Sequence, residues 1–158
     1  KSNGIEVLYI GGYHAEAGLR ARQMKDQGMS VQIVSGDALV NQENWNISGD
    51  AGEGTLMTFG PDPRDKASAK AIVQKFESAG LNPEGYVLYS YAALQVFEQA
   101  ATKAKSVKSK DLINAMRSTS FDTVLGKINF DKKGDVIATK EDPLYIFYKF
   151  SKGSYAPL

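Results

Sequence analysis

The sequence contains no cysteine, which excludes a disulfide framework and a thiolate metal site. No apolar stretch approaches the roughly 20 residues that a membrane-spanning helix needs, so direct membrane insertion is not expected. The net charge of +1, from 19 basic and 18 acidic residues, lacks the basic excess that marks nucleic-acid binding. The 158 residues, of which 42% are hydrophobic and 23% charged, are typical of a folded globular domain.

The first forty residues alternate between strand-like and helix-like segments. Ile5–Ile10 is a nearly continuous apolar run and predicts a strand buried on both faces. Gly11 and Gly12 end this run, and Ala15–Gln27 has the composition of a helix. Val31–Val34 predicts a second short strand. Strand, helix and strand in this order form a βαβ unit, so the sequence predicts an α/β fold with a parallel sheet.

The remainder of the chain continues with mixed elements around a linker at Gly60–Pro63. The further predictions are a strand at Thr55–Phe59, a helix capped by Asp65, a long helix at Tyr86–Lys103, a short helix from Ser109 or Asp111, a strand at Gly126–Phe130, a hairpin turn at Asp131–Gly134 and a last strand at Leu144–Phe150.

Three motifs suggest chemistry but lack the residues that it needs. The glycines at 11, 12 and 18 do not have the GxGxxG spacing of a dinucleotide site. His14 has no GxSxG or HExxH motif near it, so no catalytic constellation is visible and an enzyme is the weakest reading. Asp131–Asp142 resembles a calcium loop, but Lys133 and Val136 stand where an oxygen ligand and a glycine are required. We therefore expect no cofactor and no metal.

Tyr13 and Asp37 each follow the carboxyl end of a predicted strand in the same βαβ unit. Ligands of open α/β sheets bind just outside these ends. An aromatic ring and a carboxylate at that place predict a site for a small cation, such as a substrate ammonium group. The alternative, which the residues leave equally open, is that Asp37 caps a turn and Tyr13 packs on the sheet.

Five segments of the chain carry a resemblance to a known family. They are Tyr9–Gly18 (YIGGYHAEAG), Asn46–Thr58 (NISGDAGEGTLMT), Tyr91–Leu94 (YAAL), Asp122–Gly126 (DTVLG) and Asn129–Asp135 (NFDKKGD). The first is similar to a YYGGYHPEMG-type segment, and all five occur in the same order in the family that they resemble, the leucine/isoleucine/valine-binding proteins of branched-chain amino acid ABC importers.

The resemblance implies a type I periplasmic binding fold, in which two α/β lobes joined by hinge crossovers clamp a ligand. The chain is then expected to be the C-terminal part of such a protein, with the N-terminal half missing. Residues 1–58 are expected in lobe 2, residues 59–63 in a hinge strand, residues 64–139 in the helical and hairpin part of lobe 1, and residues 140–158 in a crossover and the final strand of lobe 2. Without the missing part, Leu94 and Phe97 are expected to be exposed unless a companion fragment or a dimer covers them.

The resemblance also assigns ligand-binding residues. Tyr13 matches the tyrosine of the family's GGYH turn, and Gly12 leaves room for close approach of a ligand. Asp37 stands where the family has a glutamate that pairs with the ligand ammonium, because Ser35-Gly36-Asp37-Ala38 replaces Gly-Pro-Glu-Gly. Tyr86 matches a phenylalanine that lines the side-chain pocket.

The function implied is capture of an amino acid, most plausibly a branched-chain one, without chemistry. The permease in the membrane is the implied partner, and the implied location is periplasmic or extracytoplasmic. Two alternatives stay open: an amide, urea or aromatic acid as ligand on the same fold, or a ligand-sensing domain of a receptor or regulator.

Overall fold

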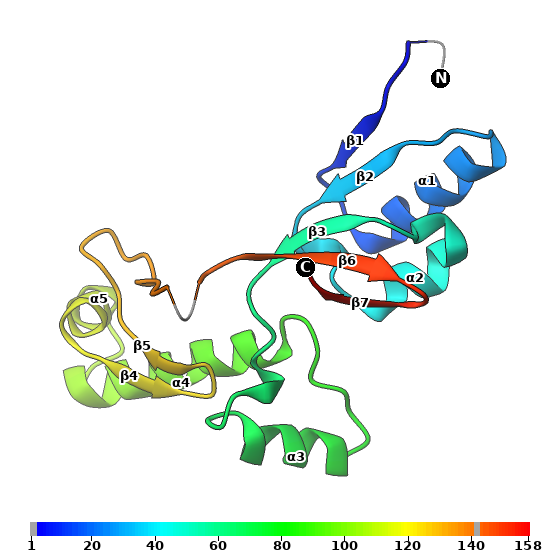
Figure 1. The fold of residues 1–158 in the computed structure, drawn as a ribbon. Coiled ribbons are helices and arrows are strands. Elements are labelled where there is room, and N and C mark those ends of the chain that lie inside the picture. Colours follow the sequence, from blue (N-terminus) through cyan, green and yellow to red (C-terminus); the bar gives the residue numbers. More distant parts are fainter. Residues whose placement is uncertain (1–2, 141–142) are drawn as a thin grey trace. The chain divides into compact units, whose positions relative to one another are not determined.

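A computed structural model describes residues 3–140 and 143–158 of the chain (Figure 1). Asp142, the last position of the calcium-like loop, lies outside the described residues, as do residues 1, 2 and 141 of the expected lobes. The chain divides into two compact units. Unit 1 comprises Lys1–Pro61 and Pro143–Leu158, and unit 2 comprises Asp62–Asp142.

Unit 1 is built on a five-stranded sheet in the order β1-β2-β3-β6-β7. Its strands are β1 Val7–Ile10, β2 Gln32–Ser35, β3 Leu56–Phe59, β6 Ile146–Ser151 and β7 Ser154–Pro157. The first three pair in parallel, whereas β6 pairs antiparallel with both β3 and β7. The predicted α/β fold with a parallel sheet is therefore confirmed, although β7 was not predicted.

The helices of unit 1 include one that the sequence analysis missed. Those described are α1 His14–Asp26, η1 Asp37–Leu39, α2 Gln42–Ser48 and η2 Gly49–Gly52. Helix α2 begins after Asn41, whose side-chain oxygen accepts the N–H of Asn44 at 2.9 Å. Its buried side is polar, with Asn44 and Ser48 both inside. A polar buried side gives no hydrophobic period, so the pattern gave no sign of a helix here.

Helices α1 and α2 approach closely because Gly18 has no side chain. A Cβ atom at Gly18 would lie 2.8 Å from Ile47 Cγ2 and 3.3 Å from the Asn44 carbonyl oxygen. Contacts this short leave no room for alanine unless α2 moves. Gly18 therefore fixes the distance between the two helices, as a small residue at a helix crossing does.

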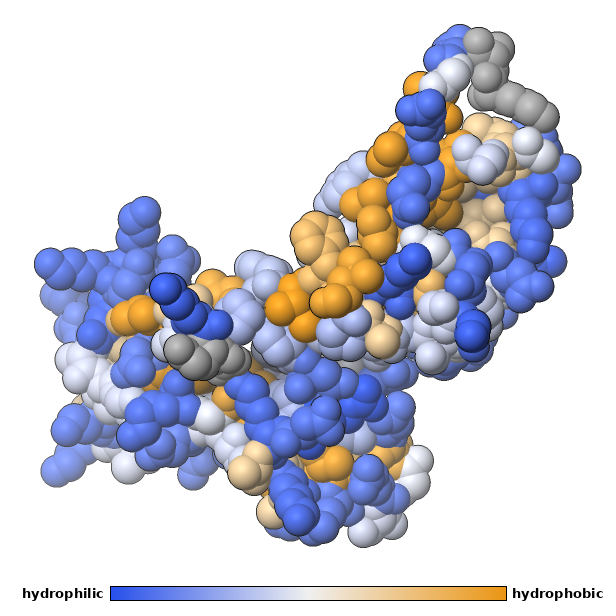
Figure 2. Space-filling model, in the orientation of Figure 1, coloured by the Kyte–Doolittle hydropathy of each residue, from blue (hydrophilic) through white to orange (hydrophobic). Residues whose placement is uncertain are grey.

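The prediction that the first strand is buried on both faces is wrong. Val7 is 59% exposed and Tyr9 is 67% exposed. Strand β1 lies at the edge of the sheet, and side chains on alternate positions face opposite sides. The described helices of unit 1 cover one face, whereas hydrophobic side chains gather over the strands on the other, as Figure 2 shows. Apolar sequence signals the tendency to be buried, but neighbouring layers decide whether burial occurs.

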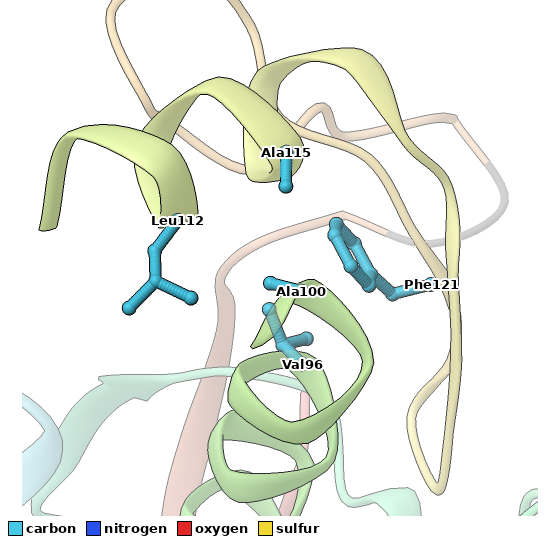
Figure 3. Packing of buried hydrophobic residues seen from close by; sticks show 5 residues of the cluster. All are labelled: Val96, Ala100, Leu112, Ala115 and Phe121. Atoms are coloured by element: carbon cyan, nitrogen blue, oxygen red, sulfur yellow. The ribbon is translucent and has the colours of Figure 1, made fainter. Parts of the chain in front are cut away.

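Unit 2 combines helices with a two-stranded sheet. Its elements are η3 Pro63–Asp65, α3 Lys70–Ser78, α4 Val87–Ala104, α5 Ser109–Ser118, β4 Phe121–Thr123 and β5 Gly126–Ile128. One core cluster of unit 2 joins α4, α5 and β4 (Figure 3), through Val96, Ala100, Leu112, Ala115 and Phe121. Another cluster contains Ala69, Leu88, Ala92 and Val124.

Two predictions for unit 2 have different outcomes. Asp65 does not cap a helix, because α3 begins after Ala69 and Asp65 instead ends η3. A carboxylate does cap η3: the side chain of Asp62, the residue before this short helix, accepts the N–H of Arg64. The expected exposure of Leu94 and Phe97 is confirmed, since these side chains are 70% and 47% exposed. What covers them stays a prediction.

The predicted hairpin turn at Asp131–Gly134 is confirmed, and one carboxylate organises it. Asp131 Oδ1 accepts the backbone N–H groups of Lys133, Gly134 and Asp135 at 2.8–2.9 Å. The residues flanking the turn, Phe130 and Val136, pair as an antiparallel bridge. The hydrogen bond to the Asp135 N–H is the main reason why the pKa of Asp131 is lowered from its ordinary value.

Gly18→Ala is expected to destabilise unit 1 by about 1–3 kcal/mol, because the added methyl group overlaps Ile47. Urea denaturation followed by circular dichroism measures this loss. Gly12→Ala is the matched control, since a Cβ there would meet only Ile10 Cγ2, at an ordinary 3.8 Å. Equal stability of the two variants would contradict the close packing of α1 on α2.

Asp131→Asn is expected to lower the urea midpoint at pH 7, because asparagine keeps an acceptor oxygen but loses the charge. A lowered folded-state pKa means that the stabilisation is present above the unfolded pKa of about 3.9 and is lost as pH falls through the folded value. The difference from wild type should therefore shrink below about pH 4. Asp135→Asn, which makes the same charge change in the same turn, is the control. A difference that persists unchanged at pH 2 would refute the carboxylate's role.

Candidate ligand-binding site

The parallel pairing of β1 with β2 brings two loops to one edge of the sheet. Ile10, the last residue of β1, lies opposite Ser35, the last residue of β2. The loop that follows β1 contains Gly11, Gly12 and Tyr13, and the loop that follows β2 leads to Asp37. Since parallel strands end on the same side, the sheet places Tyr13 and Asp37 at the same edge.

Tyr13 immediately precedes α1 and presents its ring to solvent. Its backbone is extended, its carbonyl oxygen accepts the N–H of Ala17 at 3.1 Å, and its side chain makes no capping hydrogen bond. The side chain is 73% exposed, so the alternative in which Tyr13 packs on the sheet is wrong. Gly12, just before it, is half-buried, and a Cβ atom built there would meet Ile10 Cγ2 at an ordinary 3.8 Å.

Asp37 opens the short helix η1 and is also exposed. Two features hold this segment on the protein. Leu39 is only 1% exposed, and the Asp37 carbonyl oxygen accepts the N–H of Val40 at 3.0 Å. The backbone of Asp37 is thus anchored, while its carboxylate lies at the surface.

Tyr86 belongs to unit 2, where it precedes α4 and is 51% exposed. The structure therefore brings three of the four predicted residues, Gly12, Tyr13 and Asp37, to one edge of unit 1.

Two residues at this edge were missed by the sequence analysis. Ser35 is 2% exposed, and its hydroxyl donates to the Ile10 carbonyl oxygen at 2.7 Å. The Tyr9 ring reaches toward the second loop, since a Cβ atom built on Gly36 would lie 3.8 Å from its hydroxyl oxygen. The alternation of strand side chains placed Tyr9 on one face of β1, but only the pairing of β1 with β2 shows which loop it approaches.

His14, which the sequence analysis left without a role, has a partner. Its Nε2 atom lies 3.0 Å from Oε2 of Glu43, in the first turn of α2. Because His14 is the first residue of α1, this contact joins the starts of the two helices that follow the site loops. The histidine is therefore a structural neighbour of the site, in keeping with the absence of a catalytic motif around it.

The chemistry available at this edge is that of recognition. A carboxylate and an aromatic ring, both accessible, suit a small ligand that carries an ammonium group. Among residues 3–140 and 143–158, no group of three or more histidine, aspartate or glutamate side chains is placed to hold a metal ion. Within the same residues, no helix is both long enough and apolar enough to cross a membrane.

Known proteins are similar to this chain over nearly all of its length. A Leu/Ile/Val-binding protein homolog 1 from Brucella suis is 48% identical over 155 residues, which are 98% of this chain and 41% of the relative. An amino acid binding protein from Pseudomonas aeruginosa is 39% identical over 161 residues, covering all of this chain and 42% of the relative. The crystal structure of the leucine binding protein LivK from Thermotoga maritima superposes with a TM-score of 0.79 at 28% identity, over 96% of this chain and 43% of that one.

The chain thus spans less than half the length of each of these relatives. A sequence profile of the family described as periplasmic binding protein matches residues 1–150, which is nearly the whole chain. The resemblance of the YIGGYHAEAG segment is confirmed on this wider basis, and the chain belongs to the periplasmic binding protein family.

Proposed function

We propose that this chain forms part of a solute-binding protein that captures a branched-chain amino acid and delivers it to the permease of an ABC importer. The observation that carries the proposal is the placement of Tyr13 and Asp37 at the ends of adjacent parallel strands. The names of the relatives, which include Leu/Ile/Val-binding and amino acid binding proteins, support the class of ligand.

Each residue of the site has a defined role in the proposal. Asp37 supplies the negative charge that pairs with the ligand ammonium group. Tyr13 supplies an aromatic surface beside that group. Gly12 lets the ligand approach the backbone, because no Cβ intervenes. In the proposal these groups bind the ligand and release it unchanged, so the protein is not an enzyme.

The lobe assignment completes the proposal and is supported by the family resemblance. Residues 1–58 and 140–158 belong to lobe 2, residues 59–63 form a hinge strand, and residues 64–139 belong to lobe 1. Tyr86 is the lobe 1 residue that contacts the ligand side chain. The protein works outside the cytoplasm, where a solute-binding protein meets both its ligand and its permease.

Titration calorimetry of the protein in its full natural length tests this function. Leucine, isoleucine or valine is expected to bind saturably. Asp37→Ala should weaken binding by roughly 30- to 5,000-fold, because an ammonium group left without its partner in a closed site costs about 2–5 kcal/mol.

Asp50→Ala is the matched control, because Asp50 is an exposed acidic residue of η2 in the same unit. It should leave affinity unchanged. If an amide, urea or an aromatic acid bound saturably and no amino acid did, that compound would replace branched-chain amino acids as the ligand class. No binding by any of the twenty amino acids would overturn the proposed ligand.

Gly12→Ala gives an independent measure of how close the ligand comes. The unliganded structure accepts this methyl group with an ordinary contact of 3.8 Å to Ile10, so the fold should keep its stability. We expect affinity to fall roughly tenfold or more, because the methyl group occupies space intended for the ligand. Calorimetry and thermal unfolding of the same sample separate the two effects, and an unchanged affinity would place the ligand away from Gly12.

A further inference from the structure

The two site loops are tied together where their strands end. The Ser35 hydroxyl donates to the Ile10 carbonyl oxygen at 2.7 Å, across 25 positions of sequence. Ser35 is 2% exposed, so water competes little for this hydroxyl and the bond persists. Gly11 and Gly36 follow directly, and glycine leaves a backbone free to move. The bond therefore fixes the last residues before the glycines of both loops.

A second tie joins the same two segments at their far ends. His14 Nε2 and Glu43 Oε2 are 3.0 Å apart, and they lie at the starts of α1 and α2. Four residues further along each helix, Gly18 meets Ile47 in the close contact described above. Residues four apart share one face of a helix, so the His14–Glu43 contact and the Gly18–Ile47 contact lie on the same seam between α1 and α2.

We propose that Ser35 and His14 are positioning residues that set the separation of Tyr13 and Asp37. The two ties, Ser35–Ile10 and His14–Glu43, are called the brace. This inference rests on the proposed function of Tyr13 and Asp37. A site that is held in place before the ligand arrives loses less conformational freedom on binding, so the brace raises affinity without touching the ligand.

The sequence of the second loop makes the Ser35 hydrogen bond important for Asp37. Gly36 separates the two residues, and glycine constrains the backbone less than any other residue. Aspartate has a short side chain, so the position of its backbone largely decides where its carboxylate lies. The bond from Ser35 to Ile10 therefore holds the strand end from which Asp37 is placed.

Ser35→Ala in the protein of full natural length tests the first tie. Affinity for the branched-chain amino acid should fall roughly tenfold, which is the size expected from one buried hydrogen bond. Ser48→Ala is the matched control, because Ser48 is similarly buried in the same unit but its hydroxyl donates to the carbonyl oxygen of the adjacent Gly49, at 3.4 Å, and not to the other site loop. The control should leave affinity unchanged. Equal losses in both variants would show a merely structural role and overturn the inference.

A double-mutant cycle on His14→Gln and Glu43→Gln tests the second tie. Each single change should weaken binding by roughly two- to fivefold, as for an exposed pair, and the double change should weaken it no further. Lys127→Gln breaks a more exposed ion pair, with Asp122 in unit 2, and should leave affinity unchanged. Independent, additive losses at His14 and Glu43 would refute a tie between them.

Amide hydrogen exchange without ligand separates a failure of the brace from a failure of the proposed function. Exchange at Tyr13 and Asp37 should quicken in Ser35→Ala and stay unchanged in Ser48→Ala. If the wild type binds none of the twenty amino acids, the proposed function falls, and the exchange rates still decide whether the brace orders the loops. If the wild type binds leucine and Ser35→Ala matches it in both affinity and exchange, the brace is refuted.

Discussion

The parallel pairing of β1 with β2, with Ile10 opposite Ser35, is the constraint on which the site depends. It places two strand ends at one edge of the sheet and so brings together Tyr13 and Asp37, which are 24 positions apart in the sequence. A shift of the register by one residue would turn the Ser35 side chain to the other face of the sheet and break its bond to Ile10. The chemistry of recognition therefore follows from the pairing of two apolar strands.

The close contact of α1 with α2 at Gly18 is the second constraint, and it follows from the first. The two helices start from the two site loops, and Gly18 lets them approach until Ile47 is in contact. The described helices of unit 1 lie over one face of the sheet (Figure 1), and the strand register places the exposed side chains of Val7, Tyr9 and Phe147 on the other. At the edge of the sheet that carries Tyr13 and Asp37, the two loops are held together by the contacts Ser35–Ile10 and His14–Glu43.

Much of the fold was predictable because it follows from local signals. Gly11 and Gly12 marked the end of β1, a nearly continuous apolar run marked that strand itself, and the order strand, helix, strand implied parallel pairing. Helix α2 escaped prediction because its buried side carries Asn44 and Ser48, which have no apolar period. The exposure of β1 was missed for a related reason: an apolar run predicts a tendency to be buried, whereas the layer that would bury it is a property of the assembled fold.

The sequence alone determined the class of fold, the glycine turn before Tyr13, the carboxylate at Asp37 and the Asp131 turn, because each depends on residues close together in the chain. Only the tertiary structure decided that Ser35 bonds to Ile10, that His14 meets Glu43 and that Tyr9 lies against Gly36. These contacts join segments 25 or more residues apart. They form only when the strands pair in this register and the helices pack at this distance, and no local sequence pattern specifies the register or the distance.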